Sequence, residues 1–132
     1  MPSGNKRPIE KSVRLFEERG ETSRFVDAEV NEHGDLVFSG QDVGKGPLEW
    51  WGDSDYEFWV IVASHNKGLV LKGLVDCFGQ AQLPQLANDP FDEDLVLLAQ
   101  LEHVYRDHFH AVDEFIHFLQ SQDIPFESGT YA

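Results

Sequence analysis

Residues 91–122 contain neither glycine nor proline, and this uninterrupted stretch limits the fold more than any other feature of the chain. Apolar residues recur through it at alternating spacings of three and four, from Leu98 to Leu119, which is typical of helices with one buried face. Pro90 suits the first turn of a helix, where no backbone N–H is needed. The stretch therefore predicts one long helix, or two helices that meet near residues 106–111, the more compact arrangement.

Earlier in the chain, the apolar residues alternate with a period of two. Residues 12–20 predict one strand, and residues 23–40 predict a hairpin whose turn is "NEHGD". The glycine-rich residues 41–49 predict a loop. Residues 56–63 are apolar on both faces, which predicts a strand in the centre of a sheet with both faces covered. Residues 124–132 predict a short closing strand, and Pro125 within it indicates a sheet edge.

Strands that precede helices indicate an α+β fold. We expect an antiparallel sheet of about four or five strands with two or three helices packed on it. Residues 1–11 predict a flexible tail, and residues 12–132 a single domain of ordinary size. No apolar run resembles a signal peptide or a membrane span, so a cytoplasmic protein is expected, as a monomer or weak dimer.

Charge is the strongest global property of the chain. It has 24 Asp and Glu residues against 10 Lys and Arg, which gives a net charge of −14. From Gly73 onward, Arg106 is the only basic residue. Such a field repels nucleic acid and anionic membranes, because phosphate binding requires cationic groups. It attracts a basic protein and speeds the encounter, although acidity can also serve solubility alone.

Aromatic and acidic residues are densest in "GPLEWWGDSDYEFWVIV", residues 46–62. Trp50 and Trp51 stand outside the periodic run, so they either fold back onto the core or act as exposed anchors of an interface. The carboxylates of this segment alternate, which on an extended backbone points them to one side: Asp53, Asp55 and Glu57. These carboxylates are expected to form turns, although they could also hold a divalent cation through their oxygens or contact a partner.

The histidines suggest a second kind of site. Histidines and carboxylates recur at spacings of four and three, and a fold that gathered them could bind a metal: His103, Asp107, His110, Glu114 and His117. The same pattern describes a solvated helix face. His108 falls in the apolar series, which predicts a buried histidine with a hydrogen-bond partner. Residues 64–79 predict a further helix that ends at Gly79, so Cys77 lies near its C-terminus and is expected to be inert.

No catalytic motif is present in the sequence. It has no Gly-x-Ser-x-Gly elbow and no Cys/His zinc spacing. We therefore expect no catalytic residue, no bound metal and no cofactor. The alternative hypothesis is a metal-dependent enzyme or metal-binding protein that uses the histidine and carboxylate series.

Three segments carry a resemblance to a known class of proteins: "GDLVFSGQDVG", "WWGDSDYEFWVIV" and "FLQSQDIPFESG". Together they resemble the small acidic immunity proteins that neutralise toxins in bacterial competition, and the resemblance covers residues 12–130. It implies an antitoxin that binds a basic, nuclease-type toxin domain and occludes its active surface. No functional residue follows from the resemblance itself.

Acidic and aromatic residues are therefore the candidate contacts with a basic partner. They are Trp50, Trp51, Asp53, Asp55, Glu57, Asp92, Glu93, Asp94, Asp107, Asp113 and Glu114.

Overall fold

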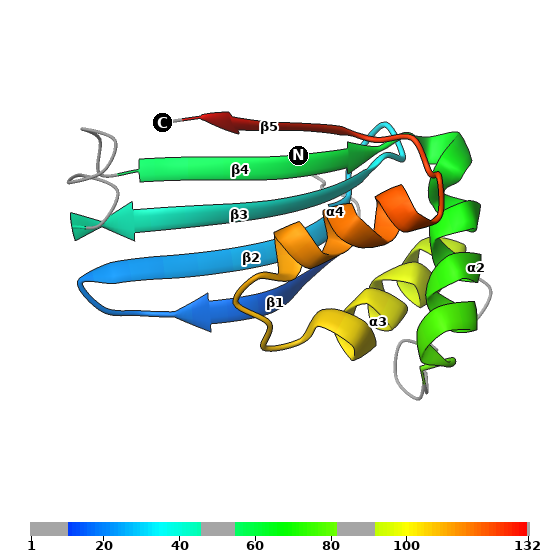
Figure 1. The fold of residues 1–132 in the computed structure, drawn as a ribbon, viewed down its shortest axis with the longest axis horizontal. Helices are drawn as coiled ribbons and strands as arrows, with labels where there is room; N and C mark the ends of the chain where they lie inside the picture. The colour runs from blue at the N-terminus through cyan, green and yellow to red at the C-terminus, as the bar shows by residue number, and fades with distance from the viewer. Residues whose placement is uncertain (1–10, 46–54, 82–91, 132) are drawn as a thin grey trace, which may run out of the picture.

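The computed structural model describes residues 11–45, 55–81 and 92–131 of the chain. Five strands form one antiparallel sheet in the order β1-β2-β3-β4-β5 (Figure 1). The strands are β1 (Ser12–Glu18), β2 (Thr22–Val30), β3 (Leu36–Gly44), β4 (Asp55–Val62) and β5 (Glu127–Tyr131). Between β4 and β5 lie the short 3₁₀ helix η1 (Ser64–Asn66) and the helices α2 (Lys67–Phe78), α3 (Glu93–Tyr105) and α4 (Ala111–Ser121). The predicted α+β fold is confirmed.

All three α-helices lie on the same side of the sheet (Figure 1). Helix α3 packs against β1 and β2, α4 packs against β3 and β4, and α2 packs against α3. Alternate residues of the central strands, such as Val26, Phe38 and Val60, are fully buried beneath the helices. The ring of Phe38 stacks on that of Phe115 with centroids 4.5 Å apart, which joins the sheet to α4.

The predicted hairpin is present, and its turn shows why. The side-chain oxygen of Asn31 accepts hydrogen bonds from the backbone N–H groups of His33 and Asp35, and Gly34 has a φ of 83°. Residues 41–44 belong to β3, so the predicted loop at 41–49 is wrong over this part. The ladder with β2 continues until Gly44, whose φ of 125° suits glycine.

Strand β4 differs from its prediction. It is paired on both sides, with β3 and β5, but of its two faces only one is covered by the described helices. Val60 and Val62 are buried, whereas Trp59 and Ile61 on the other face are only half-buried. The apolar residues on the second face of β4 therefore belong to an aromatic and aliphatic surface that the described helices leave uncovered.

The long glycine-free stretch forms two helices, which are separated by residues 106–110. Asp107 lies in the turn with a φ of 65°, a conformation that aspartate tolerates better than most residues. Its backbone N–H donates to the carbonyl of Leu15 at 2.8 Å, so the turn is attached to β1. The break also corrects the prediction for His108. Its side chain is 43% exposed rather than buried, because the helical spacing does not continue across the turn.

Candidate protein-binding face

The side of the sheet that faces away from the helices is the largest candidate surface. We call it the open face. Strand register places its residues in rows across the sheet, and the central row is Arg14, Asp27, Ser39, Trp59 and Gly129. The row on one side is Glu29, Val37, Ile61 and Glu127, and the row on the other is Glu17, Phe25, Gln41, Glu57 and Tyr131. The open face therefore combines aromatic, aliphatic and polar side chains with carboxylates and Arg14.

Along β1, the basic groups of the open face are already paired. Arg14 donates from Nε to Asp27 at 2.5 Å and from Nη1 to Glu17 at 2.7 Å, and Arg19 donates to Glu17 at 2.7 Å. The pKa of Glu17 lies below its ordinary value, chiefly because of the hydrogen bond from Arg19. Both guanidinium groups lie 5.1 Å from the ring centroid of Phe25. This part of the face is electrostatically neutralised.

Toward β4, the same face carries aromatic side chains and more carboxylates than basic groups. The indole of Trp59 packs against Gly129 on β5, where a Cβ would overlap the ring. Tyr131 is 70% exposed. Within the part of the chain that the structure describes, Glu57 has no basic partner, and the same holds for Glu29 and Glu127. These carboxylates remain available to an incoming cation.

A hollow of about 450 Å³ lies between these two parts of the open face. Arg14, Arg19 and Phe25 form one side of it, and Glu57 and Trp59 form the other. Its lining also contains the polar side chains Ser39 and Gln41. Because the indole of Trp59 lies beside the carboxylate of Glu57, that side of the hollow is suited to an arginine or lysine side chain from another molecule, whereas Arg14 and Arg19 already contact Phe25 on the other side.

The predicted contact residues do not form one surface. Trp50, Trp51 and Asp53 lie outside the described residues. Asp55 and Glu57 are both exposed and lie on the open face, as their alternation predicts. The acids of the helices lie elsewhere: Asp92, Glu93 and Asp94 at the start of α3, Asp107 in the turn, and Asp113 and Glu114 at the start of α4.

Two of the helix acids serve the fold. Asp92 caps α3 by accepting from the backbone N–H groups of Asp94 and Leu95. Asp94 binds Lys67 at 2.6 Å and Lys11 at 3.1 Å. Partial burial alone would raise the pKa of Asp94, but hydrogen bonds from the two lysines outweigh burial and leave this pKa below its ordinary value. Acids engaged in this way contribute less to an intermolecular contact.

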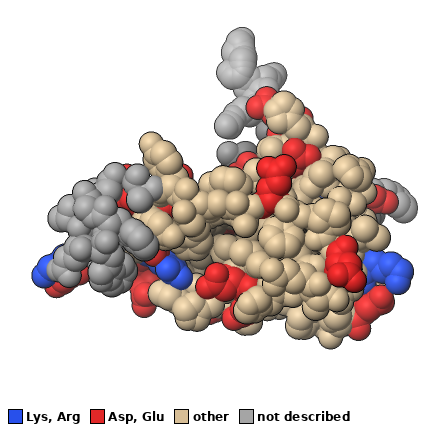
Figure 2. Space-filling view, turned by 45° about the horizontal axis from the view of Figure 1, so that its top comes forward, with Lys and Arg blue, Asp and Glu red and all other residues tan. Residues whose placement is uncertain are grey.

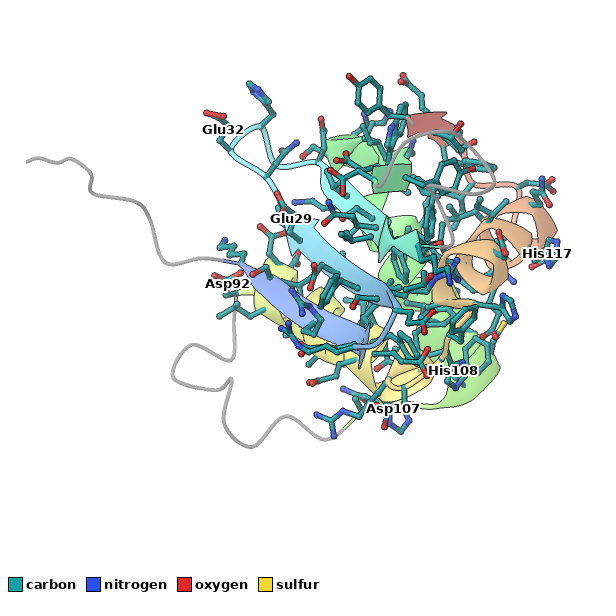
Figure 3. All side chains as sticks on the ribbon, turned by 90° about the vertical axis from the view of Figure 1, so that its left-hand side faces the viewer. Glu29, Glu32, Asp92, Asp107, His108 and His117 are labelled. Atoms are coloured by element: carbon teal, nitrogen blue, oxygen red, sulfur yellow. The ribbon has the colours of Figure 1, made fainter. Side chains whose placement is uncertain are left out.

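The histidine and carboxylate series does not converge. His103 lies on α3 and His117 on α4, and the turn between these helices redirects the chain. Figure 3 shows His117 well apart from Asp107 and His108 at the turn. Glu114 instead binds Nδ1 of His108 at 2.7 Å. Among residues 11–45, 55–81 and 92–131, no three His, Cys, Asp or Glu side chains are placed to bind one metal ion.

Sequence reasoning missed a buried ion pair. Arg24 binds Asp42 through two parallel hydrogen bonds, Nε to Oδ1 at 2.6 Å and Nη2 to Oδ2 at 2.7 Å. Its third nitrogen donates to the carbonyl of Phe109, and its guanidinium stacks 4.0 Å from the Phe109 ring centroid and 5.0 Å from that of Phe58. Asp42 belongs to the "GQD" segment of the resemblance, and its role here is to join β2, β3 and the α3–α4 turn.

The pairing of Arg24 with Asp42 can be predicted by counting residues along both strands from the hairpin turn. Val30 and Leu36 face each other next to the hairpin turn, and counting six residues back along β2 and forward along β3 brings Arg24 opposite Asp42. Extending the hairpin beyond residue 40 would have paired the two charges.

Comparison of the chain with known protein families, with curated proteins and with solved structures finds no match. None of the described helices is long and apolar enough to cross a membrane.

Proposed function

We propose that this protein is a non-enzymatic, acidic binding domain that neutralises a basic toxin of the nuclease type in the bacterial cytoplasm. The observation that carries the proposal is the open face, on which Trp59 and Tyr131 lie among carboxylates that have no basic partner in the described chain. Aromatic anchors surrounded by charge are typical of protein interfaces.

Charge supports a basic partner. A chain with a net charge of −14 attracts a cationic protein over distances of about a Debye length, which is roughly 8 Å at physiological salt. A nuclease needs cationic groups to bind the phosphates of its substrate. Carboxylates such as Glu57 and Glu127 can occupy those groups, so binding would exclude the substrate without any chemical reaction.

The hollow on the open face supplies a place for an anchoring contact. A partner arginine that enters it would lie against the ring of Trp59, with its guanidinium directed at Glu57 and away from Arg14 and Arg19, which already contact Phe25. Trp59 is held in position by its packing over Gly129, so little side-chain entropy is lost on binding. A partner is thus expected to depend strongly on this small region.

The proposal is tested by capturing partners from a lysate of the source cells with three versions of the chain. The first is the wild type, the second carries Glu57→Lys and Trp59→Ser, and the third carries Asp76→Lys. Asp76 is exposed on α2 and paired with Lys72, so its substitution changes the charge as Glu57→Lys does while leaving the open face intact.

We expect the wild type and the α2 variant to retain the same basic protein, and the open-face variant to lose it. The captured protein should degrade nucleic acid when purified alone and lose this activity when the wild-type chain is added. Retention by all three versions, or a captured protein without such activity, would contradict the proposal.

A further inference from the structure

The two edges of the sheet differ in how well they are protected. At the β1 edge, a bulge interrupts the register between Arg14 and Phe16, and the carbonyl of Leu15 accepts a hydrogen bond from Asp107. Leu15 is 1% exposed, and α3 packs along this strand. Bulges and covering elements are the usual means by which proteins block an edge strand.

The β5 edge lacks these protections. Its register with β4 is continuous, and four of its five residues are exposed. Within the described residues, its backbone forms hydrogen bonds with β4 alone. The strand contains no lysine, proline or bulge, so its outward N–H and C=O groups form a template for another strand.

A second hollow, of about 280 Å³, lies directly beside this edge on the helix side. It lies between β5 and α4, and its lining includes Ser128, Thr130, Asp113 and Ile116, together with Arg24, whose charge is paired with that of Asp42. Register places Ser128 and Thr130 on the helix side, opposite Val60 and Phe58. In a strand added to β5, every second side chain would therefore point toward α4, and the others would continue the open face beside Tyr131.

Charge indicates which kind of strand fits. Asp113 is largely exposed on the helix side of β5, with Nδ1 of His110 at 3.9 Å, and Glu127 lies on β5 itself. Figure 2 turns the β5 side toward the viewer and shows Asp and Glu side chains across the surface, with Lys and Arg only toward its sides. A second copy of this chain would bring the same acidic residues to the edge, so self-pairing is disfavoured.

We infer that the β5 edge binds an extended segment of a partner protein as a sixth strand, and that this segment alternates basic with apolar side chains. Its basic side chains would point to the helix side and meet Asp113, with their apolar stems against Ile116, and its apolar side chains would lie on the open face beside Tyr131. The inference rests on the proposed function in one respect, because the segment belongs to the basic partner. The inference also specifies how that partner is bound: main-chain hydrogen bonds to β5 hold it next to the open face.

The test uses the full chain and a short synthetic peptide that alternates lysine with valine, capped at both ends. A matched peptide with glutamate in place of lysine is the control. Binding is followed by amide chemical shifts and by hydrogen exchange in NMR. We expect the lysine peptide to shift the amides of residues 127–131 and of Asp113 and Ile116, and to slow exchange at alternate amides of β5.

Two exposed-site variants make the test specific. Thr130→Lys and Asp113→Lys should each weaken binding of the lysine peptide by roughly tenfold, because a repulsion replaces an attraction or a neutral contact. Asp76→Lys should leave binding unchanged. The inference is overturned if the glutamate peptide binds equally well, if the lysine peptide does not bind, or if it shifts only the amides around Phe25 and Trp59.

Sedimentation equilibrium tests whether a second copy of this chain, rather than a basic partner, binds the β5 edge. A stable dimer that Thr130→Lys dissociates would assign the edge to a second copy and overturn the inference. Failure of the sixth-strand inference can be distinguished from failure of the proposed function. A partner captured by the wild type and lost with Glu57→Lys and Trp59→Ser, but retained by Thr130→Lys, would refute only the sixth strand.

Discussion

Removing Arg24 should destabilise the fold more than any other single charge substitution in the described residues. Its side chain is 18% exposed and that of Asp42 is 7% exposed, so each charge depends on the other for compensation. Arg24→Met keeps most of the apolar stem, but it removes the guanidinium that lies against Phe58 and Phe109 and leaves Asp42 without its partner.

The expected magnitude follows from this geometry. Breaking a buried ion pair by removing one partner costs about 3–5 kcal/mol, because an uncompensated charge stays in a poorly solvated site. For a domain of this size, each kcal/mol lowers Tm by about 3–5 °C, so Arg24→Met should lower it by roughly 10–20 °C. The loss is a large fraction of the ~5–15 kcal/mol that stabilises most domains.

The assay is urea unfolding followed by tryptophan fluorescence, with the wild type, Arg24→Met, Asp42→Leu and the double variant. The double variant should be less destabilised than the two single variants together by roughly 2–3 kcal/mol, since it buries no unpaired charge. Single-variant losses below about 1 kcal/mol that simply add would refute the reasoning, because they are typical of a solvent-screened surface pair.

Three further results are expected. Gly40→Ala should destabilise the protein by roughly 1–3 kcal/mol in urea unfolding, because the added Cβ would overlap the ring of Phe58 on the neighbouring strand. The matched control is Gly68→Ala in α2, where nothing lies within 4 Å of the new Cβ and the change should stabilise by about 1 kcal/mol. Asp94→Asn should lower stability at neutral pH, because Asp94 loses its charge-assisted bonds to Lys67 and Lys11. Since the folded-state pKa of Asp94 is depressed, this deficit should persist above 3.8, its ordinary pKa, and shrink as the pH falls through the folded-state value, which urea titrations at several pH values would show. Finally, the association rate with the basic partner, measured by stopped-flow, should fall at least about tenfold from low to high salt.

Each of these results can fail in a recognisable way. A Gly40→Ala substitution that costs no stability would mean that movement of the Phe58 ring relieves its crowding against the new Cβ. A deficit in Asp94→Asn that does not change with pH would assign the loss to packing rather than to charge. An association rate that does not depend on salt would remove electrostatic steering from the account.

The elements predicted correctly are those governed by local chemistry. Period-two alternation and the turn residues Asn31 and Gly34 determine the β2–β3 hairpin, and Pro125 precedes an edge strand as expected. The break between α3 and α4 has no glycine or proline to mark it. It depends on Asp107, whose positive φ and hydrogen bond to Leu15 are tertiary features, so the periodicity alone placed His108 incorrectly.

The candidate surface was predictable only in part. Alternation correctly placed Asp55 and Glu57 on one side of a strand, but the apolar character of Trp59 and Ile61 suggested burial. Whether a strand face is covered depends on where distant helices pack, and a single strand's pattern carries no such information. The separation of the helix acids from the open face is likewise a consequence of the three-dimensional arrangement.

The most direct test of the central claim is growth of cells that express the captured partner. The account predicts that the partner alone stops growth and that co-expression of the wild-type chain or of Asp76→Lys restores it. The chain with Glu57→Lys and Trp59→Ser should fail to restore growth although it folds normally. Equal protection by all three chains, or a partner that is harmless when expressed alone, would contradict neutralisation through the open face.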